Sequence, residues 1–151
     1  EIAATILCEG KSSLIVKDLR EEKRIIESID IDLQILEEGG LILLDISCQQ
    51  ENLKIAESEI NKILKELTRD LVTNKDLERA KRLVINNIYF SLELSTQIAS
   101  TLGNQALWGR HQSVLKSIDD ISYWTTSRLK ELIFPLFNPE NAFTLIAEPE
   151  E

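Results

Sequence analysis

Strict alternation of apolar and polar residues is the feature that most constrains how this chain folds. From Ser28 to Ile35 every second residue is Ile or Leu, and Ser, Asp and Gln stand between them. A period of two with branched apolar residues on one side is typical of a half-buried strand. The alternation returns between Leu41 and Gln49, after Glu37-Glu38-Gly39-Gly40. We therefore predict a β-hairpin whose paired glycines supply positive φ angles for the turn.

Helices are expected to cover one face of this hairpin, because a lone hairpin is only marginally stable in water. Apolar residues at intervals of three and four predict an amphipathic helix from Leu53 to Leu71. Thr73-x-x-Asp76 resembles a capping box, which starts a helix that reaches Leu92. Further helices are predicted over residues 1–8, 12–23, 95–109 and 117–134.

The end of the chain completes the predicted fold. Asn138-Pro139-Glu140-Asn141 is typical of a turn, and Ala142 to Ala147 form a predicted final strand. Strands with helices between them predict an α+β fold, mainly an antiparallel sheet with a layer of helices packed on one face. The strands are few for such long helices, and the chain begins with Glu and contains no Met. We expect a single partial domain over residues 1–151 whose N-terminal strands are missing.

Charge and hydropathy exclude two classes of partner. The net charge is −9 and the basic residues are scattered among acidic neighbours, whereas a nucleic-acid backbone needs clustered Lys and Arg. No stretch approaches the roughly 20 consecutive apolar residues that cross a bilayer. We expect a soluble domain with no nucleic-acid partner and no membrane span. The compartment stays open, with the cytoplasm favoured.

The chain lacks the residues of a catalytic centre. His111 is its one histidine, while catalytic zinc sites take three protein ligands and a helical HExxH motif needs two histidines. Cys8 and Cys48 lie within apolar patterns, so we expect inert core thiols and leave open whether they form a disulfide. Trp108 and Trp124 are interpreted as core residues. We predict no catalytic residue, no metal ligand and no cofactor in this chain.

Short motifs, taken in order, resemble one known family. Gly10-Lys11-Ser12-Ser13 precedes Leu19-Arg20-Glu21-Glu22-Lys23 and the alternating strand pair. This order resembles the second domain of a half-molecule in the insulinase/pitrilysin-like zinc peptidase family, which includes the mitochondrial processing peptidases. Leu77-Glu78-Arg79-Ala80-Lys81 is similar to the family's E-L-E-R-A-K helix start. Leu102-Gly103 and the turn at 138–141 resemble its closing segment, so the resemblance covers nearly the whole chain.

The resemblance implies a role in a peptide-binding chamber. In this family two homologous halves enclose unfolded peptides, and an HxxEH segment with a distal Glu binds zinc on the first domain of the active half. In the second half an Arg, and a Tyr seven residues later, help to hold the substrate backbone. Arg20 falls on the Arg position, Glu27 on the Tyr position, and Arg24 where Gly is usual. We therefore predict Arg20 as a substrate-binding residue, whereas an ionised Glu27 can only accept hydrogen bonds.

Two functions follow from the resemblance. In the first, the chain is a non-catalytic domain that forms a chamber wall, contacts unfolded peptide and supports a zinc-bearing domain elsewhere. Zinc is then expected in a partner or a missing domain, and the chain is inactive alone. In the second, it is a degenerate scaffold or assembly subunit with no substrate contact. Either function needs a homologous domain or half-molecule as partner, and an exposed sheet edge would allow a homo-oligomer. An unrelated domain with its own small-molecule pocket is the third possibility.

Overall fold

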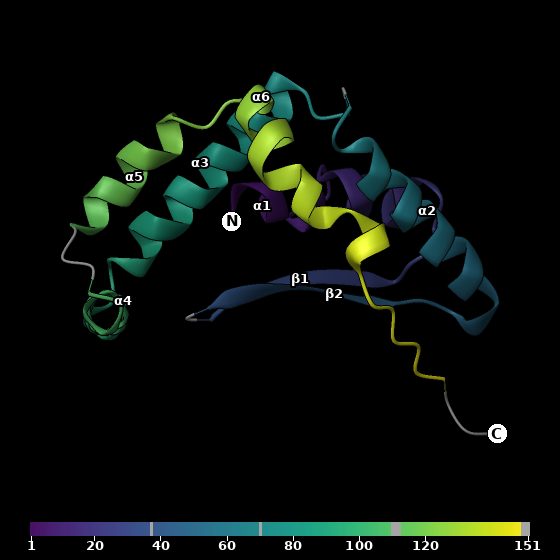
Figure 1. Ribbon diagram of the computed structural model, residues 1–151, viewed down its shortest axis with the longest axis horizontal. Helices are drawn as coiled ribbons and strands as arrows, with labels where there is room; N and C mark the ends of the chain where they lie inside the picture. Colours follow the sequence, from purple (N-terminus) through teal and green to yellow (C-terminus); the bar gives the residue numbers. More distant parts are fainter. Residues whose placement is uncertain (37, 70, 110–112, 149–151) are drawn as a thin grey trace.

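The computed structural model describes residues 1–36, 38–69, 71–109 and 113–148, without the side chains of residues 114 and 115. A first helical part leads into a hairpin, and a longer helical part follows it (Figure 1). The longer elements are α1 (Ile2–Cys8), β1 (Ser28–Leu36), β2 (Gly39–Ser47), α2 (Leu53–Glu66), α3 (Asn74–Ser91), α4 (Ser95–Leu107) and α5 (Val114–Ser122). The shorter ones are α6 (Thr126–Arg128), the π-helices η1 (Val16–Glu22) and η3 (Leu129–Ile133), and the 3₁₀-helices η2 (Gln50–Asn52), η4 (Phe134–Phe137) and η5 (Pro139–Asn141).

The antiparallel pair of β1 and β2 confirms the hairpin that the alternation predicts. Ile29 stands opposite Ile46 and Ile31 opposite Leu44, and all four side chains pack against the core. The polar residues between them are exposed on the opposite face. Figure 1 shows α1, α2, α3 and α6 on one side of the hairpin. The predicted α+β fold, with helices layered on one face of an antiparallel sheet, is therefore confirmed.

The first helix, α1, lies in the core because all of its residues except Thr5 are apolar. Its residues from Ile2 to Leu7 are all buried, and the helix contacts both α3 and β1. The most deeply buried side chains around it come from segments far apart in the sequence and include Leu19, Leu67, Leu129 and Phe134. The core thus joins the beginning of the chain to the turns that follow α6.

The end of α1 is held by Arg79 of α3. Its Nη1 donates to the carbonyl of Glu9 at 2.8 Å, and its Nη2 donates to the carbonyl of Thr5 at 3.2 Å. The last carbonyls of a helix lack intrahelical donors, and a cation is favourable beside them. Gly10 follows with a φ of +82°, and its carbonyl accepts from the hydroxyl of Ser13 at 2.7 Å. The Gly-x-Ser-Ser and Glu-Arg-Ala-Lys motifs therefore meet at one structural junction.

The start of α3 confirms the predicted capping box. The backbone N–H of Asp76 donates to Oγ1 of Thr73 at 3.3 Å, and the N–H of Thr73 donates to Oδ2 of Asp76 at 3.0 Å. Each residue thus satisfies a backbone donor that the first turn of a helix leaves free. The predicted apolar stripe is buried at Leu77, Ala80 and Val84.

The hairpin turn and the chain end differ from the predictions. Gly39 and Gly40 lie inside β2 and neither has a positive φ, so the expected role of paired glycines is wrong; Glu37 lies outside the described residues. Residues 142–148 form no strand, and the described sheet has two strands instead of three. Their backbone is without a neighbouring strand in the described ranges, and a strand needs one to pair its N–H and C=O groups. Phe143 is 90% exposed as a result.

The helix predicted over residues 117–134 is divided into shorter ones. It begins earlier, as α5, and ends at Ser122, whose hydroxyl donates to the carbonyl of Asp119 at 2.6 Å. Thr125 then caps α6, because its Oγ1 accepts from the N–H of Arg128 at 3.2 Å. Hydroxyl side chains that bond nearby backbone compete with a continuous helix. The helix predicted to reach Leu71 likewise ends earlier, at the end of α2.

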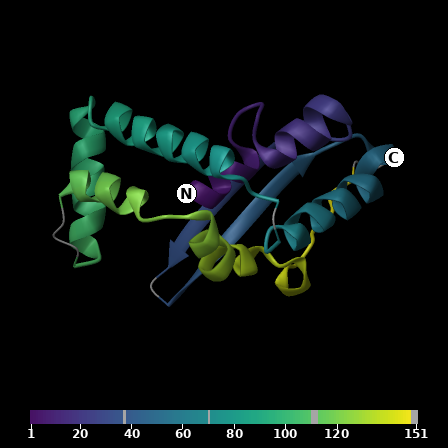
Figure 2. The ribbon, with the colours of Figure 1, turned by 90° about the horizontal axis from the view of Figure 1, so that it is seen from above.

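The helix α4 lies apart from the rest, at the ends of α3 and α5 that are far from α2 (Figures 1 and 2). It has no buried residue. Trp108, which follows it, is 47% exposed, so its interpretation as a core residue is wrong, whereas Trp124 packs against the core. Within the described ranges, no helix combines the length and the hydropathy of a membrane span.

Candidate functional site

The segment that carries Arg20 is π-helical, where the sequence predicted an ordinary helix. The N–H of Lys23 donates to the carbonyl of Asp18 at 2.9 Å, five residues back. Ion pairs have the same spacing: Nζ of Lys23 lies 2.9 Å from Oδ2 of Asp18, and Nζ of Lys17 lies 3.8 Å from Oε1 of Glu22. In an α-helix of 3.6 residues per turn, residues five apart point about 140° away from each other. The π geometry therefore brings these pairs together.

Arg24 ends this segment in the left-handed region, with a φ of 54°. The N–H of Ile25 then donates back to the carbonyl of Leu19 at 2.8 Å, and the side chain of Ile26 is buried. Helices often end on a left-handed residue, which is usually Gly because Gly has no Cβ. This backbone gives a physical reason for the Gly that is usual here in the family the sequence resembles. Arg24 keeps the conformation and adds an exposed cation.

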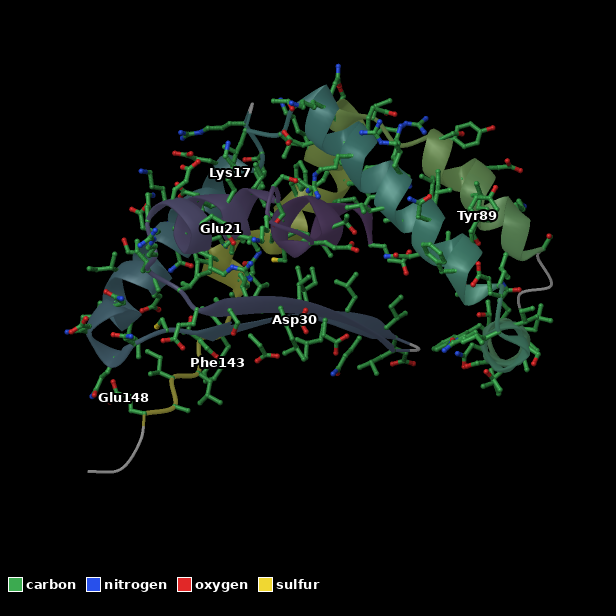
Figure 3. All side chains as sticks on the ribbon, turned by 180° about the vertical axis from the view of Figure 1, so that it is seen from behind. Lys17, Glu21, Asp30, Tyr89, Phe143 and Glu148 are labelled. Atoms are coloured by element: carbon green, nitrogen blue, oxygen red, sulfur yellow. The ribbon has the colours of Figure 1, made fainter. Side chains whose placement is uncertain are left out.

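Arg20 is partly accessible and already has a partner. Its side chain is 37% exposed, and its Nε and Nη2 both donate to Oε1 of Glu21, at 3.1 and 2.9 Å. In the described part of the chain no acceptor bonds its Nη1. One edge of the guanidinium is thus occupied, and the other edge is available to a carbonyl oxygen. Figure 3 shows Glu21 and Lys17 on η1, above the strand that carries Asp30.

Glu27, at the predicted Tyr position, lies just before β1. Its N–H donates to the carbonyl of Ser47 at 2.8 Å and extends the hairpin by one bond, while its side chain is exposed. No hydrogen bond or ion pair between described residues joins it to Arg20. The structure therefore places Arg20 within η1 and Glu27 on the connection between η1 and β1, and the two side chains form no hydrogen bond or ion pair with each other.

An open hollow lies between η1 and α2. Lys23 donates a hydrogen bond across it to Glu59 of α2. Hydrogen bonds to Glu59, which has the larger effect, and to Asp18 raise the pKa of Lys23. The contact with Lys23 lowers the pKa of Glu59. The hollow is lined mainly by charged side chains: Lys17, Asp18, Glu22, Lys23, Glu59, Lys62 and Glu66. It is not the apolar pocket that a small-molecule site would require.

The resemblance implies zinc in another domain, and the described residues of this chain offer no set of donors that fits it. Over the described ranges no three His, Cys, Asp or Glu side chains come together in a way that could hold a metal ion. Burial, and to a lesser extent the charge of Asp30, raise the pKa of the Cys8 thiol to about 12, whereas zinc takes the thiolate. Cys48 is also a free thiol, so the two cysteines form no disulfide. His111 lies outside the described residues, and no zinc-dependent step is assigned to this chain.

Two side-chain contacts were not predicted from the sequence. Glu21 binds Arg20, and the signal was the acid that directly follows the arginine in the Leu-Arg-Glu motif. Arg79 binds the end of α1, and its signal was an arginine between the buried positions Leu77 and Ala80 of an amphipathic helix. Both pairings involve geometry that residue types alone do not fix.

Comparison with known proteins agrees with the motifs. Residues 1–84 match the family described as the peptidase M16 inactive domain. The uncharacterized zinc protease YmxG of Bacillus subtilis (strain 168) is 27% identical over 143 residues, which cover 94% of this chain and 35% of that protein. This chain thus spans about a third of the length of the curated relative it matches.

Solved structures share the fold. A protease from Helicobacter pylori superposes with a TM-score of 0.75 and 20% identity, over 87% of this chain and 32% of that one. A zinc-protease candidate from Bordetella pertussis Tohama I superposes with a TM-score of 0.72 and 15% identity, over 86% of this chain and 71% of that one. At these identities the similarity shows the fold alone.

Proposed function

This chain belongs to the family of peptidase M16 inactive domains, and from that premise we propose that it forms a non-catalytic wall of a peptide-binding chamber. In this proposal it supports a zinc-bearing domain that lies in another part of the protein or in a partner. The partner is a homologous domain or half-molecule. The peptide itself is unfolded when it reaches the wall, so that its backbone carbonyls are free to accept hydrogen bonds.

The observation that carries the proposal is the state of Arg20. It stands at the substrate-binding position of the resembled motif, within the matched residues 1–84, and its Nη1 edge has no acceptor among the described residues. A guanidinium donates to carbonyl oxygens and never accepts. A hydrogen bond from a charged donor contributes about 1.5–3 kcal/mol when it is sheltered from water. Arg20 would therefore hold one carbonyl of an extended peptide.

Glu27 changes what the second position can do. A tyrosine there would donate from its hydroxyl to a second carbonyl, but an ionised carboxylate accepts only. Glu27 would therefore receive a peptide N–H. Its exposure and its place next to the hairpin leave it accessible for that contact.

We also propose that further strands complete the sheet. The hairpin has both outer edges unpaired within the described residues. Residues 142–148 belong to no helix or strand, and Phe143 and Leu145 are 90% and 83% exposed. Open edges and free strands pair readily with other chains. A second copy of this chain could occupy the same edges and give the predicted homo-oligomer.

The scaffold function is the second candidate, and specific observations favour it. Glu27 replaces the usual Tyr and Arg24 the usual Gly, and Arg20 is bound to its neighbour Glu21. A subunit that never touches substrate would tolerate all of these changes. It would also bind a homologous half and leave peptide turnover to other residues.

One experiment separates the two candidates. Arg20→Ala is made in the complete assembly, and cleavage of an unstructured peptide is measured after assembly has been verified by size-exclusion chromatography. The chamber-wall function predicts a fall in kcat/KM of about 10-fold or more, which corresponds to the loss of one charged hydrogen bond. Arg82→Ala, on an exposed position of α3, is the matched control. If the Arg20→Ala assembly is intact and cleaves the peptide as well as the wild type does, the chamber-wall function is contradicted and the scaffold function is supported.

A further inference from the structure

Each cation of η1 and of its last cap residue pairs with a carboxylate of the same segment, and Lys23 also pairs with Glu59 of α2. Lys17 pairs with Glu22, Lys23 with Asp18, and Arg20 with Glu21. Each cation of this segment therefore already has a carboxylate within 4 Å.

Glu21 binds one edge of the Arg20 guanidinium and leaves the other edge without contact to Glu21. A single carboxylate oxygen, Oε1, accepts from both Nε and Nη2, at 3.1 and 2.9 Å. The contact fixes the plane of the guanidinium, so that Nη1 is directed away from Glu21. Both side chains are 37% exposed, which means that a ligand reaching Nη1 also experiences the negative charge of Glu21.

This arrangement would favour uncharged ligands over anionic ones. An uncharged peptide carbonyl accepts from Nη1 and meets little repulsion. A carboxylate, from an acidic side chain or a free C-terminus, is attracted by Arg20 and repelled by Glu21, so the two charges largely cancel. A lone arginine, in contrast, would favour the carboxylate, because paired arginine and carboxylate groups form strong double hydrogen bonds.

We propose that Glu21 is a positioning residue that makes Arg20 select uncharged peptide carbonyls over carboxylates. The substrate class is therefore internal, non-acidic stretches of unfolded peptide. The proposal rests on the chamber-wall function, since Glu21 acts only through Arg20. It assigns to the Leu-Arg-Glu motif a specificity that Arg20 alone does not have.

The test compares two peptides in the complete assembly. The peptides have the same length and differ only in Gln or Glu at the variable positions, with the C-terminus amidated in both. Glu21→Gln removes the charge and keeps the shape, Glu21→Asp keeps the charge, and Glu22→Gln is the control because Glu22 pairs with Lys17 instead. Thermal unfolding verifies that each variant is folded.

We expect Glu21→Gln to raise kcat/KM for the acidic peptide relative to the neutral one by about two- to fivefold, the range of an exposed ion pair. Glu21→Asp and Glu22→Gln should keep the wild-type ratio. An unchanged ratio in Glu21→Gln, while Arg20→Ala lowers cleavage of both peptides, overturns the proposal and leaves the chamber-wall function intact. Unchanged cleavage of both peptides by Arg20→Ala overturns the chamber-wall function and this proposal with it.

Discussion

Replacing Arg24 with glycine tests the backbone that connects Arg20 to Glu27. A residue with a Cβ costs about 1–2 kcal/mol in the left-handed region, and Arg24 has a φ of 54°. The greater freedom of glycine in the unfolded chain costs about 0.5–1 kcal/mol in return. The Arg24 side chain is exposed and makes no hydrogen bond or ion pair with any described residue, so its removal subtracts little. The free energy of unfolding should therefore rise by about 0.5–1 kcal/mol.

Urea unfolding followed by circular dichroism measures this change, and Tm should rise by about 1–4 °C. Arg24→Ala keeps the Cβ and should stay within about 0.5 kcal/mol of the wild type. Glu22→Gly places the same glycine inside η1, where φ is negative, and should lose about 1 kcal/mol. If Arg24→Gly is no more stable than Arg24→Ala, the inference that a Cβ at this left-handed position is strained is wrong.

Three further predictions concern the core and its helix ends. Arg79→Ala removes two hydrogen bonds to the carbonyls that end α1. It should lower the free energy of unfolding, measured in urea, by about 2–4 kcal/mol. The control Arg82→Ala, at an exposed position, should change that free energy by less than about 0.5 kcal/mol. Thr73→Ala removes the side-chain acceptor of the capping box and should cost about 1 kcal/mol in the same assay. The Cys8 thiol, with its pKa raised from 9.0 to about 12, should react with iodoacetamide roughly a thousandfold more slowly in the folded than in the unfolded chain at pH 8. As the pH rises, the folded thiol keeps its proton after the unfolded one has lost it. Cys8 should therefore contribute stability below pH 9 that is lost between pH 9 and 12. In Cys8→Ala the free energy of unfolding should fall less steeply over this pH range.

Local patterns predicted local structure well. The alternation from Ser28 onwards predicted the hairpin, and Thr73 with Asp76 predicted the capping box, because in both cases neighbouring residues decide the outcome. The strand predicted at 142–147 failed for the opposite reason. Its residues have strand propensity, but a strand also needs a neighbour to pair with, and no described segment provides one.

The substrate-binding role of Arg20 stays a prediction, and the sequence did not predict the local geometry around it. Arg20 was placed by its motif, and the unusual backbone of Arg24 could have been inferred from the Gly that is usual there. The π-helix could not be inferred, since residues five apart such as Lys23 and Asp18 would point away from each other in the α-helix that the sequence predicted. The contact of Glu21 with Arg20 joins neighbouring residues, and residue types alone do not give its geometry.

Zinc content and peptide cleavage, measured on the chain alone and again with its zinc-bearing partner, test the central claim most directly. The claim is that this chain is a non-catalytic domain. We expect less than stoichiometric zinc and no cleavage of an unstructured peptide by the isolated chain, with cleavage present only in the assembly. Stoichiometric zinc together with turnover by the isolated chain would contradict the claim.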